Sequence, residues 1–280
     1  MMRACVSNSP GSSSLTLIER PEIAKPHDCI VKILATGVCH TDLHVIDDDW
    51  PIKAQRPFVP GHEGIGEIVK IGTESVCGVG DIVGVPWLHS TCGSCEYCIG
   101  GNENYCQSAQ YTGFSVNGCF AEYILADSRF VTPIPPSLSV EQAAPICCAG
   151  VTTYRGIKET FVKPGQWLGI FGAAGGLGHL GVQLGNAMGC KCVAVVRGPT
   201  QVQIVQSWEG NARPTMIVDS TKSSMTEDVI STTQGGCHGL FLPLFETYDY
   251  HHCYQLSYIL KCNYLGQLTA NHRSNKHGSQ

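Results

Sequence analysis

"GQWLGIFGAAGGLGHLGVQLGNAMGC", residues 165–190, decides the fold of the second half of the chain. The short apolar run "WLGIF" is followed at once by a glycine-rich turn, and apolar residues then recur at helical spacing. A strand, a glycine-rich turn and a helix form the context of a dinucleotide-binding fingerprint, because glycines let the backbone approach a pyrophosphate at the helix N-terminus. "KCVAVV", residues 191–196, supplies the next parallel strand. The sequence therefore predicts a doubly wound parallel sheet that binds a nucleotide. The turn residues expected to bind it are Gly172, Gly175, Gly176, Leu177 and Gly178.

The second strand of such a unit usually ends in an acidic residue, which binds the adenosine ribose hydroxyls. Here the strand ends in Val195 and Val196, and Arg197 and Gly198 follow without an Asp or Glu. Arg197 either meets a 2′-phosphate, which would favour NADP, or is a solvated surface arginine. The sequence leaves NAD and NADP open.

Composition favours a cytoplasmic protein. The 280 residues are 43% hydrophobic, which is enough to build the core of one large domain or of two ordinary ones. The net charge is −5 and no Lys/Arg cluster runs along the chain, so we expect no nucleic-acid partner. No apolar stretch reaches the ~18 residues that a membrane span needs. The N-terminal "MMRACVSNSPGSSS" lacks the apolar region of a signal peptide.

Four of the 16 cysteines lie in one loop, "TCGSCEYCIGGNENYCQ", with the spacing C-x2-C-x2-C-x7-C. A disulfide framework is disfavoured because the cytosol keeps thiols reduced. An iron–sulfur cluster usually has other spacings. Tetrahedral zinc suits the spacing, and a metal would replace the core that this polar loop lacks. We therefore expect a structural zinc ion. Its predicted ligands are Cys92, Cys95, Cys98 and Cys106.

A second set of metal ligands is scattered over three motifs. "ATGVCHTDLH" contains Cys39, "VPGHEGIGEIVKIG" contains His62, and "APICCAGVTTY" contains Cys147 and Cys148. Two cysteines and one histidine that leave a fourth position open are typical of a catalytic zinc site. Taken singly, a buried cysteine is usually a small apolar residue.

Six motifs together resemble those of the zinc-dependent alcohol dehydrogenases of the medium-chain dehydrogenase/reductase superfamily, and most of all the yeast and fungal enzymes. The motifs are "GVCHTDLH", "GHEGIGEIVKIG", "PWLHSTCGSCEYC", "QYTGFSVNGCFAEY", "APICCAGVT" and "GAAGGLGHL", in family order over roughly residues 25–190. The resemblance implies an α/β protein with a GroES-like β-rich catalytic domain and a Rossmann domain. It also implies two zinc ions, a cofactor that is NAD or NADP, and a small alcohol or aldehyde as substrate. A homo-oligomer is compatible with the family.

The resemblance also implies a role for individual residues. Cys148, and not Cys147, aligns with the family cysteine before "AG", so the catalytic zinc ligands are expected to be Cys39, His62 and Cys148. Glu63 resembles the acid that can replace water on the metal. Asp42 resembles the acid that orients His62.

Further residues resemble the family's proton relay, cofactor contacts and pocket walls. Thr41 and His44 correspond to the relay. His40 corresponds to a contact of the cofactor pyrophosphate, and Thr152 to a residue near the nicotinamide. Trp50 and Trp87 correspond to walls that narrow the pocket, although simple core packing is the alternative for both.

The resemblance thins after residue 196. Pro243 falls inside an expected central strand, where it cannot donate a hydrogen bond to a neighbour. Because family members continue with further Rossmann strands, the resemblance implies a chain truncated at its C-terminus. We expect domains at residues 1–155 and 156–268, and a disordered polar tail at 269–280.

Three functional hypotheses follow. The first is a zinc-dependent oxidoreductase that interconverts an alcohol and an aldehyde or ketone with NAD(P). The second is a catalytically silent zinc-binding remnant of such an enzyme, favoured by the missing ribose acid. The third is a thiol redox protein, which rests only on the number of cysteines.

Overall fold

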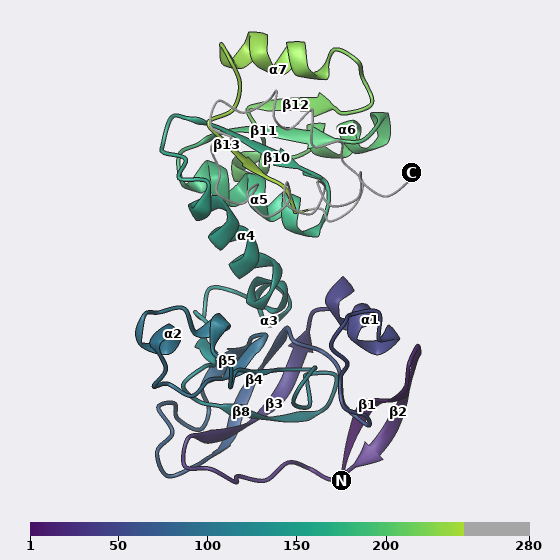
Figure 1. Ribbon diagram of the computed structural model, residues 1–280, viewed down its shortest axis with the longest axis vertical. Helices are drawn as coiled ribbons and strands as arrows, with labels where there is room; N and C mark the ends of the chain where they lie inside the picture. Colours follow the sequence, from purple (N-terminus) through teal and green to yellow (C-terminus); the bar gives the residue numbers. More distant parts are fainter. Residues whose placement is uncertain (244–280) are drawn as a thin grey trace, which may run out of the picture. The chain divides into compact units, whose positions relative to one another are not determined.

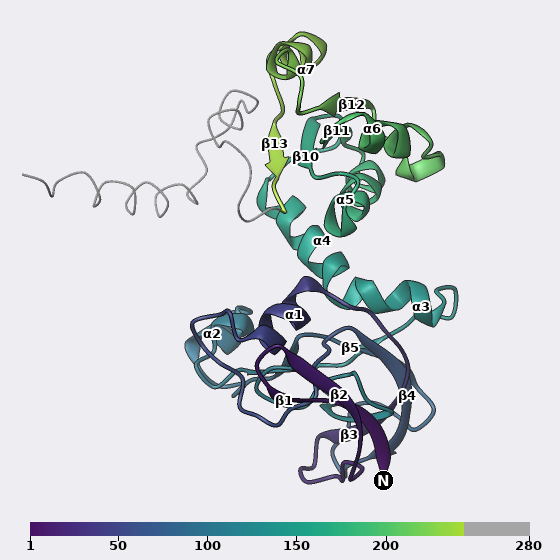
Figure 2. The same cartoon turned by 90° about the vertical axis from the view of Figure 1, so that its right-hand side faces the viewer.

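The computed structural model describes residues 1–243 (Figures 1 and 2). The predicted tail at 269–280, and the part of the predicted nucleotide-binding domain beyond residue 243, lie outside this range. The described chain forms two compact units, Met1–Val151 and a second that begins at Thr152. The functional domain boundaries at 155 and 268 stay a prediction. None of the helices in residues 1–243 has both the length and the apolar character needed to cross a membrane.

An antiparallel sheet forms the centre of the first unit. Its strands, in spatial order, are β8 (Tyr123–Asp127), β3 (Asp28–Thr36), β4 (Gly64–Ile71), β5 (Ile82–Val85) and β9 (Thr132–Pro133). The alternating sequence of β4 buries Ile65 and Ile68 completely. A Cβ at Gly66 would lie 2.2 Å from the carbonyl oxygen of Lys32. The backbones of β4 and β3 therefore approach closely at this position, which only a glycine allows.

Shorter elements surround this sheet and carry most of the candidate site residues. Two small antiparallel sheets pair β1 with β2 and β6 with β7. The bounds are β1 (Met2–Ser9), β2 (Ser12–Ile18), α1 (His40–Asp47), β6 (Leu88–Ser90), α2 (Glu96–Ile99), η1 (Glu103–Tyr105), β7 (Gln110–Tyr111), α3 (Val140–Ala143), η2 (Ala144–Cys147) and α4 (Ala149–Glu159), the last of which continues into the second unit.

The second unit contains a parallel sheet with the strand order β12-β11-β10-β13 (Figure 1). The order runs outward from β10 to β12 and then returns to β13 on the other side of β10, which is the doubly wound arrangement. The bounds are β10 (Trp167–Phe171), α5 (Gly176–Ala187), β11 (Lys191–Val196), α6 (Pro199–Gln206), η3 (Gly210–Ala212), β12 (Met216–Asp219), α7 (Met225–Thr233) and β13 (Gly239–Phe241).

Two apolar clusters cover the two faces of this parallel sheet. Leu168 and Ile170 of β10 pack with Val182 of α5 and Val205 of α6 in one cluster. Phe171 packs with residues of α7 in the other. Helices α5 and α6 therefore cover one face and α7 covers the opposite face, as right-handed crossovers require.

The strand expected around Pro243 is shorter than the pattern suggests. β13 pairs with β10 only over Gly239–Phe241 and ends two residues before Pro243. The reason is that proline has no N–H to donate to the neighbouring strand.

Candidate metal and cofactor site

Helix α1 places the first candidate ligand. Cys39 is the N-cap of this helix and has an extended backbone, so its thiol stands at the helix start. Asp42, three residues later, accepts a hydrogen bond from the Cys39 backbone N–H at 3.0 Å, in the manner of a capping box. The "CHTD" motif thereby fixes the first turn of the helix and the direction of the cysteine side chain together.

Asp42 also fixes the ring of His62. The other carboxylate oxygen of Asp42 lies 2.8 Å from Nδ1 of His62, and both side chains are buried. Because a carboxylate only accepts, Nδ1 must donate, and Nε2 is left free to bind a metal. Burial by itself would lower the pKa of His62, but its hydrogen bonds to Asp42 and then to Cys39 raise the pKa to about 9.

Four side chains from three separate segments converge in the first unit. The ligand atoms of Cys39, His62, Glu63 and Cys148 all lie within 4.8 Å of one another. The sulfurs of Cys39 and Cys148 are 4.0 Å apart. A tetrahedral zinc site with Zn–S bonds of ~2.3 Å separates its sulfurs by ~3.8 Å. The geometry and the donor types therefore both fit a zinc ion.

The electrostatics of this group also fit a cation. Hydrogen bonds from Cys148 and then from His62 lower the pKa of Cys39 to about 3, which favours the thiolate. The Cys39 thiolate raises the pKa of Cys148, and burial raises the pKa of Glu63 to about 7. A cation between these side chains would offset the repulsion among their negative charges.

Gly37 makes room for Glu63, and the sequence interpretation missed it. A Cβ at Gly37 would lie 1.8 Å from one carboxylate oxygen of Glu63 and 3.0 Å from its Cβ. The backbone N–H of Gly37 also donates to the Glu63 carbonyl oxygen at 3.0 Å. Any side chain at residue 37 would thus displace the carboxylate from the ligand group. The signal in the sequence is the glycine two residues before Cys39.

The structure separates the two adjacent cysteines at the end of η2, Cys147 inside it and Cys148 directly after it. Cys148 belongs to the ligand group. Cys147 instead packs into an apolar cluster with Ile65 and Ala143, and burial raises its pKa to about 11. A Cβ at Gly84 would lie 2.6 Å from the Cys147 sulfur. Cys147 is therefore a packing residue within the described chain.

Polar residues of α1 lie next to the ligand group. The hydroxyl and the backbone N–H of Thr41 both donate to the Cys39 sulfur. His44 is three residues further along the helix, and its Nδ1 lies 2.7 Å from a carboxylate oxygen of Asp49. The exposed ring of His40 stands 4.8 Å from that of His44, centroid to centroid.

Aromatic rings form one side of the site. The ring of Trp87 meets the ligand His62 edge-on at 5.2 Å between centroids, and Trp50 meets Trp87 at 6.1 Å. Phe114, which the sequence interpretation missed, contacts both indoles, at 5.9 and 6.0 Å. Tyr111 stacks on Trp87 at 5.3 Å. Trp87 thus lies beside a candidate metal ligand and Trp50 packs on Trp87, and segment 110–118 supplies rings that support both indoles.

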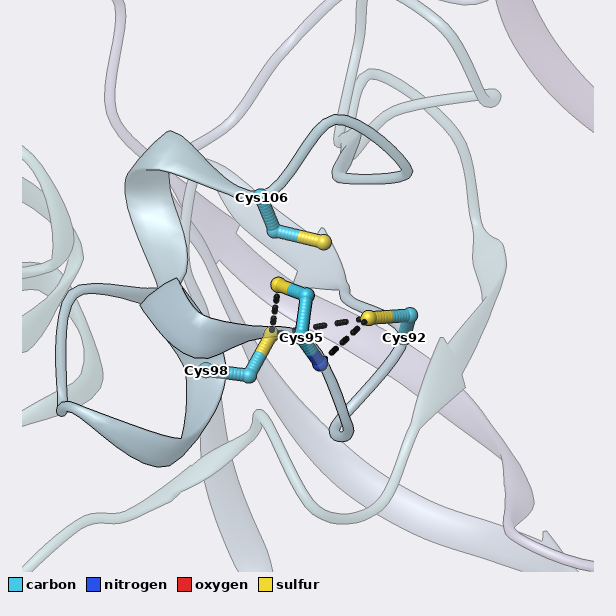
Figure 3. A group of neighbouring side chains, drawn as sticks. All are labelled: Cys92, Cys95, Cys98 and Cys106. Carbon is cyan, nitrogen blue, oxygen red and sulfur yellow. Dashed lines mark hydrogen bonds between the residues drawn. The ribbon is translucent and has the colours of Figure 1, made fainter.

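The four loop cysteines form the second metal-ligand group. Figure 3 shows their sulfurs gathered around one centre, and the four sulfurs lie within 4.8 Å of one another. The sulfur of Cys98 is 3.8 Å from that of Cys92 and 3.5 Å from that of Cys95. These spacings match tetrahedral zinc and are far longer than the ~2.05 Å of a disulfide.

Backbone groups stabilise a thiolate in this loop. The N–H groups of Ser94 and Cys95 donate to the Cys92 sulfur and lower its pKa to about 6. None of the apolar clusters in residues 1–243 includes a residue from 91 to 109. A metal ion is therefore the only core that the described loop has available.

The glycines of the glycine-rich turn in the second unit have different structural roles. Gly172 has φ +59°, a left-handed conformation that favours glycine. A Cβ at Gly178 would lie 2.1 Å from the Gly172 carbonyl oxygen, so the helix packs directly on the turn. A Cβ at Gly176 would meet no protein atom within 4 Å, and one at Gly175 only the Gly172 carbonyl oxygen, at 3.2 Å. The backbone there is open to a ligand, as pyrophosphate binding requires.

The remaining cofactor candidates also lie in the second unit. Arg197 directly follows β11 and is exposed. Thr152 is exposed on α4, whereas its neighbour Thr153 is buried and donates to the Leu177 carbonyl oxygen at 3.3 Å.

Comparisons with known proteins agree with this arrangement. The family model of the alcohol dehydrogenase GroES-like domain matches residues 25–136. An alcohol dehydrogenase of Schizosaccharomyces pombe is 42% identical over 240 residues, which cover 84% of this chain and 67% of that protein. Across five such curated relatives, the chain spans 56–67% of their length.

Solved structures show the same fold. The chain matches a cinnamyl alcohol dehydrogenase of Sorghum bicolor with a TM-score of 0.79 and 28% identity, over 91% of this chain and 73% of that one. It matches the CAD of Helicobacter pylori, solved in complex with NADP(H), with a TM-score of 0.69 and 26% identity, over 77% of this chain and 64% of that one.

Proposed function

The chain belongs to the alcohol dehydrogenases with a GroES-like domain, and on that premise we propose that it interconverts an alcohol and an aldehyde or ketone by hydride transfer with NAD or NADP. The observation that carries this proposal is the convergence of Cys39, His62, Glu63 and Cys148 beside Thr41 and the two tryptophans. The substrate is a small molecule. We propose a cytoplasmic location and leave a homo-oligomer open.

Two zinc ions per chain are part of the proposal. Cys39, His62 and Cys148 would hold the catalytic ion, and Glu63 would bind it whenever substrate is absent. When bound, zinc supplies a Lewis acid that lowers the pKa of a substrate hydroxyl or polarises a carbonyl. A structural ion would be held by Cys92, Cys95, Cys98 and Cys106.

The chain's own side chains position the ligands and move the proton. Asp42 holds His62 with Nε2 free for the metal. Thr41 lies against the Cys39 sulfur, where its hydroxyl can accept the substrate proton while it passes its own proton on toward His44. His44 shares the face of α1 with Thr41, because residues three apart on a helix are neighbours. Its half-exposed ring, oriented by Asp49, can release the proton to solvent.

The glycine-rich turn is proposed to bind the cofactor. Gly175 and Gly176 leave the backbone open at the N-terminus of α5, where a pyrophosphate is favoured. A nicotinamide cofactor accepts or donates the hydride. The structural neighbour solved with NADP(H) supports a cofactor of this class.

Removal and return of metal test the proposed function. The purified chain should oxidise a small primary alcohol and form reduced nicotinamide, lose this turnover after dialysis against a chelator, and regain it with Zn²⁺. A chelator-treated sample that receives Mg²⁺ is the control. Turnover that survives complete removal of zinc would contradict the proposal. A chain that holds zinc and cofactor but turns over no alcohol would instead be the silent zinc-binding protein.

A further inference from the structure

Two histidines lie one turn apart on helix α1. His40 is the first residue of this helix and His44 follows four residues later, so their side chains are neighbours on one face. The ring centroids are 4.8 Å apart and the ring planes are inclined by 38°. Two histidines at this spacing on a helix can bind one metal ion together. Imidazole nitrogens that share a zinc ion lie ~3.3 Å apart, which rings this close allow.

The ring of His44 is held in the orientation that a metal ligand needs. Its Nδ1 lies 2.7 Å from a carboxylate oxygen of Asp49. Because a carboxylate only accepts, Nδ1 donates and the lone pair of Nε2 is left free. The ring also stacks on Trp50, at 6.1 Å between centroids and 25° between planes. A carboxylate behind the imidazole is the usual partner of a metal-bound histidine. His44 is therefore preorganised as one ligand, and the exposed ring of His40 is the second.

The charges around this pair favour a cation. Residues 47–49, at the end of the helix, are all aspartates. Arg56 pairs with Asp48 at 2.9 Å, and Lys53 donates to the backbone carbonyl oxygen of Asp48. The three acids outnumber these two bases, so the end of the helix that carries His44 keeps a net negative charge.

We propose that His40 and His44 form a third metal site, which takes up a divalent transition metal ion such as Zn²⁺ or Ni²⁺ from solution. The two cysteine-rich groups bind such ions more tightly, because they offer thiolates. Two imidazoles leave the other coordination positions to water, so an ion at this pair exchanges with solution. It would occupy Nε2 of His44, the nitrogen left to receive a proton. On the premise of the proposed function, excess metal would therefore slow turnover.

Nickel binding tests the site without reference to turnover. The untagged full chain, loaded with zinc, is dialysed against Ni²⁺, and both metals are counted per chain. We expect one Ni²⁺ to bind saturably while the zinc content stays constant. Mn²⁺ should bind far more weakly, because it stands at the low end of the order of divalent-metal affinities. If no Ni²⁺ bound, or if each bound Ni²⁺ displaced a zinc ion, the proposal would be overturned.

Histidine variants assign the bound nickel to the pair. His40→Gln and His44→Gln should each weaken Ni²⁺ binding by at least the ~10-fold that loss of an outer-shell partner costs, because each removes a direct ligand. His27→Gln is the control, since it removes a histidine of the same unit that is paired with Glu74 and lies outside the pair. Nickel affinity as high in His40→Gln and His44→Gln as in His27→Gln would refute the site.

Aspartate variants separate orientation of the ring from general charge. Asp49→Ala removes the hydrogen bond to His44 and should weaken Ni²⁺ about 10- to 100-fold. Asp47→Ala removes the same charge from the same helix and should have a much smaller effect. Equal losses in the two variants would contradict the proposed ligand geometry.

Turnover distinguishes this inference from the proposed function. Ni²⁺ should slow alcohol oxidation by the wild-type chain at concentrations near the Kd obtained by dialysis. Full turnover with Ni²⁺ bound would overturn the inhibitory role of the site. A chain that binds Ni²⁺ at the pair but oxidises no alcohol would refute the proposed function and leave the metal site standing.

Discussion

Asp42 shows how one side chain serves both folding and function. Its two oxygens bind the Cys39 backbone and the His62 ring, so the start of α1 and the orientation of a metal ligand depend on the same carboxylate. The contact with His62 is buried and the contact with the Cys39 backbone is partly buried, so water competes little with the hydrogen bond to His62. In the proposed reaction, Asp42 would therefore act through its neighbours.

Asp42→Asn should weaken the catalytic site without unfolding the chain. The amide can still accept from His62 but cannot accept from both N–H groups, and it removes the negative charge behind the imidazole. We expect a fall of about 10- to 100-fold in catalytic zinc affinity and turnover. Competition with a chromophoric chelator measures the affinity. The exposed Asp47→Asn, on the same helix, is the control. Equal zinc affinity in the wild type, Asp42→Asn and Asp47→Asn would contradict the role of Asp42 in positioning His62.

We expect Phe114 to limit the size of the substrates that the protein accepts. It contacts both Trp50 and Trp87, so its removal would free both of the residues that are predicted to wall the substrate pocket. Phe114→Ala should raise the kcat/KM ratio of benzyl alcohol to ethanol about 10-fold or more. Phe161→Ala, at a ring that is 78% exposed, should leave the ratio unchanged. A ratio that did not move in Phe114→Ala would show that the indoles are only packing residues.

At the scale of elements, the loop from β6 to β7 contrasts with the sheet beside it. The sheet is held by buried side chains such as Val31, Ile68 and Val83. The loop offers only Cys106 as a buried apolar residue between 91 and 109. Its short helix α2 has no buried residue at all. Such a segment needs metal binding to offset the conformational entropy of ordering it.

Cys98→Ser should therefore remove the order of this loop. The variant should hold one zinc fewer per chain and be cut by protease within residues 91–109. Structural zinc contributes on the order of 10 kcal/mol to the folding of small metal-dependent segments, which the remaining three sulfurs cannot replace. Ile99→Ser changes an adjacent side chain that is 78% exposed and should retain both metal and resistance. Resistance of Cys98→Ser equal to that of wild type would contradict a metal core.

The elements nearest the glycine-rich turn could be predicted closely from the sequence. "WLGIF" and "KCVAVV" coincide with β10 and β11, because short apolar runs between turn signals become buried parallel strands. The helix is found as expected, but its buried face is formed by Gly178, Gly181, Val182 and Gly185. The leucines that suggested the helix are only partly buried, since the small residues bring α5 close to the strands.

At the scale of the whole molecule, the candidate metal ligands and the candidate nucleotide-binding turn lie in different units. Both metal-ligand groups lie within the first unit, and the glycine-rich turn and Arg197 lie within the second. The sequence motifs and the family resemblance named Cys39, His62, Glu63 and Cys148, and the structure brings their ligand atoms together. Two contacts could not be foreseen from the sequence. Asp219 accepts hydrogen bonds from Gly198 and Thr221, and the ring of Phe114 contacts both Trp50 and Trp87. Both depend on pairings between segments that are distant in sequence, which local pattern does not specify.

The central claim is that Cys148, with Cys39 and His62, holds a catalytic zinc ion. The measurement that tests it most directly is the zinc content and alcohol turnover of Cys148→Ser beside Cys147→Ala. The two variants change adjacent cysteines, of which only Cys148 belongs to the ligand group. Cys147→Ala should keep two zinc ions and near wild-type turnover. Cys148→Ser should keep only the structural ion and lose turnover. If Cys148→Ser retained both ions and full activity, the assignment of this site would be wrong.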